Sequence, residues 1–259
     1  MSVNLAGFDA WCQAAGHSEG TRRLRQCYIR RLMENTDPTT CTMSDVALFL
    51  ARDDWSAATK ASARSALMVL FEWMQLEGLR SDSPMKGMKP VRVKAGVPHP
   101  CPEQAVQDAL AQATKRTRLA VMLAAYAGLR RAEIASLHAD NIGDSELRVT
   151  GKGDRIRLIP IHPLLEPCVA PYRGTGVYLF PSPAGGHLTP TQVGRIVSKM
   201  LPNGYSTHSL RHRFATQVHS QSRNLRAVQT LLGHASVATT QVYTNVSSEE
   251  LSEAVGLIA

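Results

Sequence analysis

The side chains best suited to chemistry lie in the C-terminal half of the chain. They are two arginines, a lysine, two histidines and a tyrosine, namely Arg130, Lys152, His208, Arg211, His234 and Tyr243. Arginine and lysine bind phosphate oxygens, and the planar guanidinium can bind two oxygens at once. A tyrosine hydroxyl can attack a phosphorus atom. If the fold brings these side chains together, we expect a phosphoryl group to be transferred to Tyr243.

His208 and Arg211 are three residues apart, so they share one face of a helix. Thr207 and Ser209 are residue types found at helix starts, which places His208 in a first turn, where the helix dipole favours an anion. An isolated His-x-x-Arg is more often a surface arginine with a hydrogen-bonded histidine. The pair therefore predicts a phosphate site only together with the other residues.

His208 and His212 have the spacing of two zinc ligands on one helix. Zinc hydrolases with this spacing carry a glutamate directly after the first histidine, and this chain has Ser209 there. No third ligand is obvious. We therefore expect no metal.

Three other segments supply the remaining groups. Arg130 follows Gly128, which ends a helix, and Glu133 is placed to form an ion pair with a neighbouring arginine. Lys152 lies at the tip of a predicted hairpin, where a lysine is ordinarily solvated but could also protonate a leaving oxygen. His234 follows a helix-ending glycine. Tyr243, nine residues later, would on its own be read as a core residue.

The elements expected to position these groups are mainly helical. Residues 1–82 read as a bundle of four helices, and 83–102 are rich in proline, glycine and basic residues, which predicts a linker. A long surface loop within one domain is the alternative. Residues 103–259 form the second domain, with a hairpin at 147–150 and 156–161, a possible third strand at 177–180, and helices that include 236–244. The predicted fold is mainly α with a small antiparallel β-sheet (α+β).

Composition limits the classes of function. The chain has 259 residues and a net charge of +8, of which +7 falls in residues 91–259. This charge suits a polyanionic partner, although it could equally serve solubility. The five cysteines include no C-x-x-C pair and predict no disulfide framework. No signal peptide or membrane-spanning run is visible, so we expect a cytoplasmic protein, in bacteria or a phage-infected host.

Taken together, the motifs resemble a known family. Gly-Leu-Arg-x-x-Glu, Gly-Lys-Gly, His-x-Leu-Arg-His, Leu-Gly-His and a tyrosine nine residues later occur in the order found in tyrosine recombinases, the phage integrases and Xer-type enzymes. The resemblance covers about residues 100–246 and extends more loosely to the N-terminal bundle, which looks like the family's core-binding domain. It implies a site-specific recombinase that cleaves and rejoins double-stranded DNA.

The resemblance also implies a role for each residue. Arg130 and Arg211 would clamp the scissile phosphate, and Tyr243 would form a 3′-phosphotyrosyl link. His208 would act as base or orienting acceptor, and Lys152 would protonate the departing 5′ oxygen. His234 would donate to a phosphate oxygen, although some family members carry tryptophan there. Glu133 and His212 would support these groups.

Exchanging one phosphoester for another conserves bond energy, so we expect no cofactor, neither ATP nor metal. The sequence contains no phosphate-binding loop of the G-x-x-x-x-G-K-[ST] type. The basic residues expected to track DNA phosphates are Arg22, Arg23, Arg30, Lys60, Arg64, Arg92 and Lys94. By helical periodicity we expect the first three on one solvated face of a helix.

Assembly follows from the same resemblance. The apolar tail, residues 249–259, is expected to dock on a neighbouring protomer in a tetrameric synapse, with packing on its own subunit as the alternative. The bundle begins near residue 1, so we expect no arm-site-binding domain and short recombination sites. An accessory directionality factor is a further possible partner.

Other functions remain open. An Xer-like enzyme that resolves dimers differs from an integrase in role but not in motifs. A type IB topoisomerase uses similar residues as a monomer. A non-catalytic DNA-binding protein would carry a purely structural tyrosine. We favour the integrase.

Overall fold

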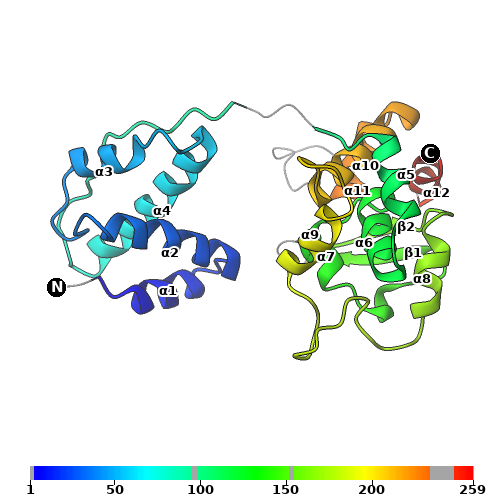
Figure 1. Cartoon of the computed structure of the whole chain (residues 1–259). Helices are drawn as coiled ribbons and strands as arrows, with labels where there is room; N and C mark the ends of the chain where they lie inside the picture. The colour runs from blue at the N-terminus through cyan, green and yellow to red at the C-terminus, as the bar shows by residue number, and fades with distance from the viewer. Residues whose placement is uncertain (1–2, 95–98, 152–154, 234–247, 259) are drawn as a thin grey trace. The chain divides into compact units, whose positions relative to one another are not determined.

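The protein divides into two compact units, Met1–Gly96 and Val97–Ala259 (Figure 1). The computed structural model describes residues 3–94, 99–151, 155–233 and 248–258. Both ends of the expected linker pack on the nearer unit. Met85 joins the N-terminal core and Cys101 joins the C-terminal core. The assignment of separate functional domains to residues 1–82 and 103–259 stays a prediction.

The N-terminal unit is the expected helical bundle. Its helices are α1 (Leu5–Ala14), α2 (Glu19–Met33), α3 (Met43–Leu50) and α4 (Ala57–Leu76). Each begins at a polar residue whose side chain accepts a hydrogen bond from a backbone N–H of the first turn: Asn4, Ser18, Thr42 and Ser56. Such caps satisfy donors that the helix itself leaves unpaired. The caps therefore explain why each helix starts where it does.

Helical periodicity predicts an apolar stripe of Leu24, Cys27, Tyr28 and Leu32 on α2, and the structure buries only part of it. Tyr28, Ile29 and Leu32 are buried in the N-terminal core, whereas Leu24 is 49% exposed and Cys27 is exposed. The buried face of α2 is therefore centred on Ile29 and Leu32 and not on Leu24 and Cys27.

The C-terminal unit combines helices with one small sheet. Its longer helices are α5 (Glu103–Ala111), α6 (Lys115–Tyr126), α9 (Pro190–Ser198), α10 (Thr207–Ser222), α11 (Leu225–Leu232) and α12 (Ser248–Gly256). Short helical turns are α7 (Arg131–Ala135), α8 (Glu166–Val169), η1 (Ala139–Asn141) and η2 (Ala170–Tyr172). In the described part of the chain, no helix has both the length and the apolar character needed to cross a bilayer.

The sheet has two strands, β1 (Glu146–Thr150) and β2 (Ile156–Pro160), paired antiparallel with Thr150 opposite Ile156. The third strand expected at 177–180 is wrong. Tyr178 makes only an isolated bridge with His138. The two paired strands therefore flank the segment of sequence that contains Lys152.

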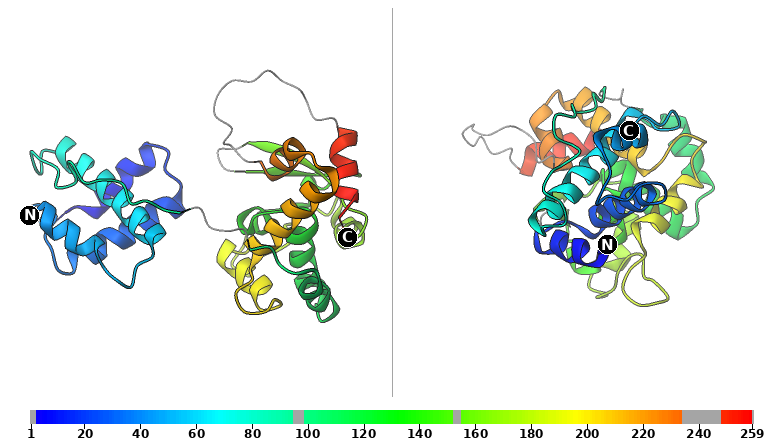
Figure 2. Two further views of the ribbon diagram at one scale, coloured as in Figure 1. Left: turned by 90° about the horizontal axis from the view of Figure 1, so that it is seen from above. Right: turned by 90° about the vertical axis from the view of Figure 1, so that its left-hand side faces the viewer.

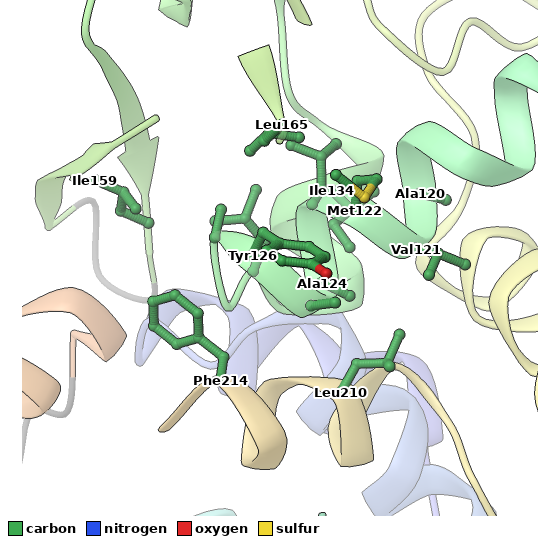
Figure 3. Packing of buried hydrophobic residues seen from close by; sticks show 14 of the residues in the cluster. Ala120, Val121, Met122, Ala124, Tyr126, Ile134, Ile159, Leu165, Leu210 and Phe214 are labelled. Carbon is green, nitrogen blue, oxygen red and sulfur yellow. The ribbon is translucent and has the colours of Figure 1, made fainter. Parts of the chain in front are cut away.

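Helix α6 is the centre of the C-terminal core. Every residue from Leu119 to Tyr126 is buried, as expected of a helix that is covered on all sides. Figure 3 shows its side chains facing Phe214 and Leu210 of α10. Because α10 packs along α6, the first turn of α10 has a fixed place in the unit.

The tail packs on its own unit. Leu251, Ala254, Val255 and Ile258 are buried in the C-terminal core, and Figure 2 shows α12 beside the other C-terminal elements. His162, itself buried, donates from Nε2 to the Ile258 carbonyl at 2.9 Å. The described tail therefore packs within its own unit, and docking on a neighbouring protomer stays a prediction. The helix expected at 236–244 lies outside the described residues.

Gly128 offers a test of how tightly α6 and α10 fit. Its φ is +62°, and a Cβ there would lie 2.6 Å from the Phe214 ring. Gly128→Ala combines left-handed strain with overpacking, so we expect a loss of about 2–5 kcal/mol in the free energy of unfolding. Gly186→Ala has a similar φ and no neighbour within 4 Å, so about 1–2 kcal/mol is expected.

Urea unfolding followed by far-UV circular dichroism measures this difference. Tryptophan fluorescence, from Trp11, Trp55 and Trp73, reports the N-terminal unit alone and should not change. Equal losses at the two glycines would contradict the tight contact with Phe214.

Candidate active site

A cleft of about 640 Å³ opens in the C-terminal unit between α7, α9 and α10. Its lining residues are Arg130, Arg131, Ala132, Thr191, Gly194, Arg195, Ser198, Ser206, Thr207, His208 and Arg211. Three of the six predicted catalytic residues, Arg130, His208 and Arg211, therefore meet here although 81 residues separate the first from the last.

Arg211 is held from two sides by helix ends. Its side chain is 6% exposed, and it donates from Nη1 to the Gly128 carbonyl and from Nη2 to the Leu232 carbonyl, the latter at 2.6 Å. These carbonyls belong to the ends of α6 and α11, where no intrahelical partner remains. A guanidinium has five N–H donors, so further donors remain for a ligand in the cleft.

Burial lowers the pKa of Arg211 to about 9, and the nearby charge of Arg130 adds to this, while Glu133 opposes it. The side chain is still cationic at pH 7. A charge held in a poorly solvated place interacts more strongly with an anion than one in water does.

Arg130 is the N-cap residue of α7. Its guanidinium is bound to Glu133 on one side and is exposed to solvent on the other. Its backbone N–H donates to Oε2 of Glu133 at 2.8 Å, and its Nη1 donates to Oε1 at 2.8 Å. The Arg130 side chain is 41% exposed, whereas that of Glu133 is 5% exposed. Glu133 thus fixes one edge of the guanidinium and leaves the other edge toward the cleft.

Glu133 has a second arginine partner, Arg157 of β2. Arg157 donates from Nη1 and Nη2 to the two carboxylate oxygens at 2.9 and 2.8 Å. Burial alone would raise the pKa of Glu133, but the bonds and charge of Arg157, and then the bonds from Arg130, lower it below its ordinary value. The carboxylate is therefore ionised at neutral pH. Sequence reasoning missed Arg157.

The alternation Ile156-Arg157-Leu158 in the sequence would place Arg157 on the solvated face of the strand, and only the register of the sheet shows that it faces inward. Val149 pairs with Arg157 in the sheet, and both Val149 and Ile159 are buried. Alternate residues of a strand face the same side, so position 157 faces inward. A charged residue at an inward position requires a partner, and Glu133 is that partner.

His208 lies in the first turn of α10, where its backbone N–H donates to Oγ of the N-cap Ser206. Its Nε2 lies 2.9 Å from Nε2 of His212, so one ring donates and the other accepts. Burial, followed by His212, Arg211 and Arg130, lowers the pKa of His208. The ring is therefore neutral at pH 7 and can accept a proton.

Lys152, His234 and Tyr243 lie outside the described residues. The structure describes the chain up to Gly151, which follows β1, and up to Gly233, which ends α11 in a left-handed conformation. Their roles remain predictions. Among the described residues, no group of three His, Cys, Asp or Glu side chains has the arrangement of a metal site.

The residues expected to contact DNA differ in availability. Arg22 is ion-paired with Asp9 and is 15% exposed, because it turns toward α1 and not onto the expected solvated face. Arg64 donates to the Met88 carbonyl at 2.5 Å. Those at the surface are Arg23, Arg30, Arg92 and Lys94, and Lys60 is half-buried. DNA contact by these residues stays a prediction.

Comparison with known proteins gives the family. Residues 102–250, more than half of the chain, match the Phage integrase family. The chain belongs to this family. It is 32% identical over 238 residues to the tyrosine recombinase XerC of Brucella melitensis, covering 82% of this chain and 76% of that protein. The family and the enzyme class expected from the motifs, a tyrosine site-specific recombinase, are therefore confirmed.

Solved structures agree with this assignment. The integrase of mycobacterium phage Brujita is 29% identical, with a TM-score of 0.57, covering 98% of this chain and 92% of that one. A lambda integrase tetramer bound to a Holliday junction shares the fold, with a TM-score of 0.70, 18% identity, and coverage of 93% and 79%. The predicted mainly helical fold with a small antiparallel sheet is confirmed.

The state of His208 can be measured directly. We expect its imidazole to titrate at a pH below the ordinary value of about 6.5, because burial and three neighbouring groups disfavour the charged form. In His212→Asn, which removes one of these groups, the midpoint should rise part of the way back. Histidine ¹³C NMR titration of the wild-type protein and of the His212→Asn variant checks this. A midpoint for His208 above the ordinary value would contradict the arrangement described.

Proposed function

We propose that the cleft binds the scissile phosphate of double-stranded DNA and that Tyr243 attacks it. The observation that carries this proposal is the convergence of Arg130 and Arg211 in one cleft beside His208. Two guanidinium groups with open donors suit two non-bridging oxygens of one phosphodiester. An anion at this place also lies at the N-terminus of α10, whose dipole favours it.

The two arginines would act mainly on the transition state. In-line attack by a phenol oxygen gives a pentavalent phosphorus with added negative charge on the equatorial oxygens. Donors that are already fixed in place stabilise such charge without reorganising. Arg211 is fixed by two helix-end carbonyls and Arg130 by Glu133, so both meet that requirement.

Proton transfers complete the reaction. A phenol has a pKa near 10 and is protonated at pH 7, so a base must take its proton or a cationic site must favour the phenolate. Neutral His208 suits the first role. Lys152 would give a proton to the departing 5′ oxygen, His234 would donate to a phosphate oxygen, and His212 would orient His208. The P–O bond to the 5′ oxygen breaks as the P–O bond to Tyr243 forms.

Because one phosphoester replaces another, the reverse attack by a 5′ hydroxyl rejoins the strand without an external energy source. We propose that the enzyme works as a tetramer on paired DNA sites in the bacterial or phage-infected cytoplasm, as the lambda integrase tetramer on a Holliday junction suggests. A directionality factor is an additional partner in this proposal.

For the biological role we propose integration of a mobile element. The near full-length similarity to a phage integrase supports it. The similarity to XerC supports dimer resolution as a second candidate. Recombination between sites on separate plasmids and between sites on one plasmid distinguishes the two, because an integrase must join separate molecules. Relaxation of supercoiled DNA without exchange would instead indicate a topoisomerase.

Covalent capture from a random pool tests the chemistry whatever the target sequence is. The chain is incubated with nicked duplexes of randomised sequence, denatured in detergent, and the DNA attached to protein is recovered and sequenced. We expect adducts with the wild-type chain and none with Tyr243→Phe. Tyr178→Phe, the same change at a tyrosine that does not line the cleft, should retain them.

Adducts that persist in Tyr243→Phe would assign the nucleophile elsewhere. Tight DNA binding with no adduct from the wild-type chain would make the protein a non-catalytic DNA-binding protein. Either result would overturn the proposed mechanism.

A further inference from the structure

Arg157 occupies an unusual place on β2. The outward positions of this strand carry apolar side chains, with Ile156 51% and Leu158 43% exposed. The inward position between them carries the charge, and the Arg157 side chain is only 8% exposed. This is the inverse of the usual pattern for a strand with one solvated face, so the arginine is placed for its contacts and not for solvation.

Arg157 forms hydrogen bonds through both Nη atoms and through Nε. Nη1 and Nη2 bind both oxygens of Glu133, and Nε donates to the Leu231 carbonyl at 2.8 Å. Glu133 in turn holds Arg130. One guanidinium therefore connects the carboxylate that orients a phosphate-binding arginine with the last turn of α11.

Arg157 also lies beside Gly151 and Gly233, the glycines that precede two of the other proposed catalytic residues. A Cβ built on Gly151 would lie 3.5 Å from Nη1 of Arg157, and one built on Gly233 would lie 3.0 Å from its Cδ. In the sequence, Lys152 follows Gly151 and His234 follows Gly233. The side chain thus lies near the two described glycines that lead, in the sequence, to Lys152 and His234.

Stability alone is a poor explanation for this pair. Burying an arginine and a carboxylate costs desolvation energy, and an apolar pair of similar volume is often as stable or more so. Arg173 forms a similar pair with Glu166 at the surface of the same unit. It binds Glu166 through both Nη atoms and donates from Nε to the Gly143 carbonyl, yet both side chains are partly exposed, 25% and 39%.

We propose that Arg157 is a positioning residue for strand cleavage, which aligns Arg130 through Glu133 and holds the last turn of α11 through the Leu231 carbonyl. This inference rests on the proposed function. It predicts that the fork geometry of Arg157, and not merely its positive charge, sets the rate of the chemical step.

The experiment compares Arg157→Lys with Arg173→Lys on a nicked duplex recovered by covalent capture. Lysine keeps the charge but cannot bind both oxygens and a carbonyl in one plane. Single-turnover adduct formation should slow on the order of 10²-fold in Arg157→Lys. The Kd for the same labelled duplex, measured by anisotropy in a Tyr243→Phe background, should change by no more than about twofold, since the loss is confined to the transition state.

Arg173→Lys, which removes an equivalent fork away from the cleft lining, should keep the wild-type rate. A double-mutant cycle adds a second readout. If Arg157 acts through Glu133, then Arg157→Met and Glu133→Gln together should slow cleavage much less than the product of the two single effects.

Three results would overturn the inference. Arg157→Lys could cleave at the wild-type rate, the two lysine variants could lose activity equally, or the loss in Arg157→Lys could lie entirely in DNA affinity or in folding measured by circular dichroism. The wild-type reaction run in parallel distinguishes failure of the proposed function from failure of this inference. A wild-type chain without any adduct overturns the proposed function and this inference with it, whereas an active wild type with an active Arg157→Lys overturns the inference alone.

Discussion

One buried carboxylate organises the candidate active site. Glu133 accepts from Arg130 and Arg157 and lies 3.8 Å from Arg211. Three guanidinium groups around a single carboxylate leave an excess of positive charge in a region of low solvation. Such an excess is costly until an anion offsets it. Glu133 therefore fixes the positions of the arginines but neutralises only one of their three positive charges. The remaining positive charge favours strong binding of a phosphate.

Helix ends supply the rest of the arrangement. The carbonyls at the ends of α6 and α11 accept from Arg211, and the first turn of α10 presents His208 to the same cleft. Unpaired backbone groups at helix ends need partners, so packing α10 against α6 and α11 does two things at once. It satisfies those groups, and it places the side chains of His208 and Arg211. The hydrophobic core and the site are thus built from the same contacts.

Local chemistry made much of the fold predictable from the sequence. Capping residues such as Ser56 and Thr42 mark where helices begin, and the sequence Gly151-Lys152-Gly153 between two alternating runs predicts the antiparallel pair of β1 and β2. The motif order gave the family, which the comparisons confirm. The predictions that were wrong depend on tertiary contacts. Residues 177–180 find no continuous strand partner, and Arg22 is drawn to Asp9 of another helix. Arg157 was overlooked because a charged residue in a short strand reads as solvated unless its buried partner is known.

The most direct measurement is a crystal structure of the Tyr243→Phe chain bound to a duplex obtained by covalent capture. The account predicts that Arg130 and Arg211 both donate, at about 2.7–3.0 Å, to non-bridging oxygens of one phosphate, with Glu133 still bound to Arg130 and Arg157. The account is contradicted if the two arginines contact different phosphates, or if Glu133 releases Arg130 when DNA binds.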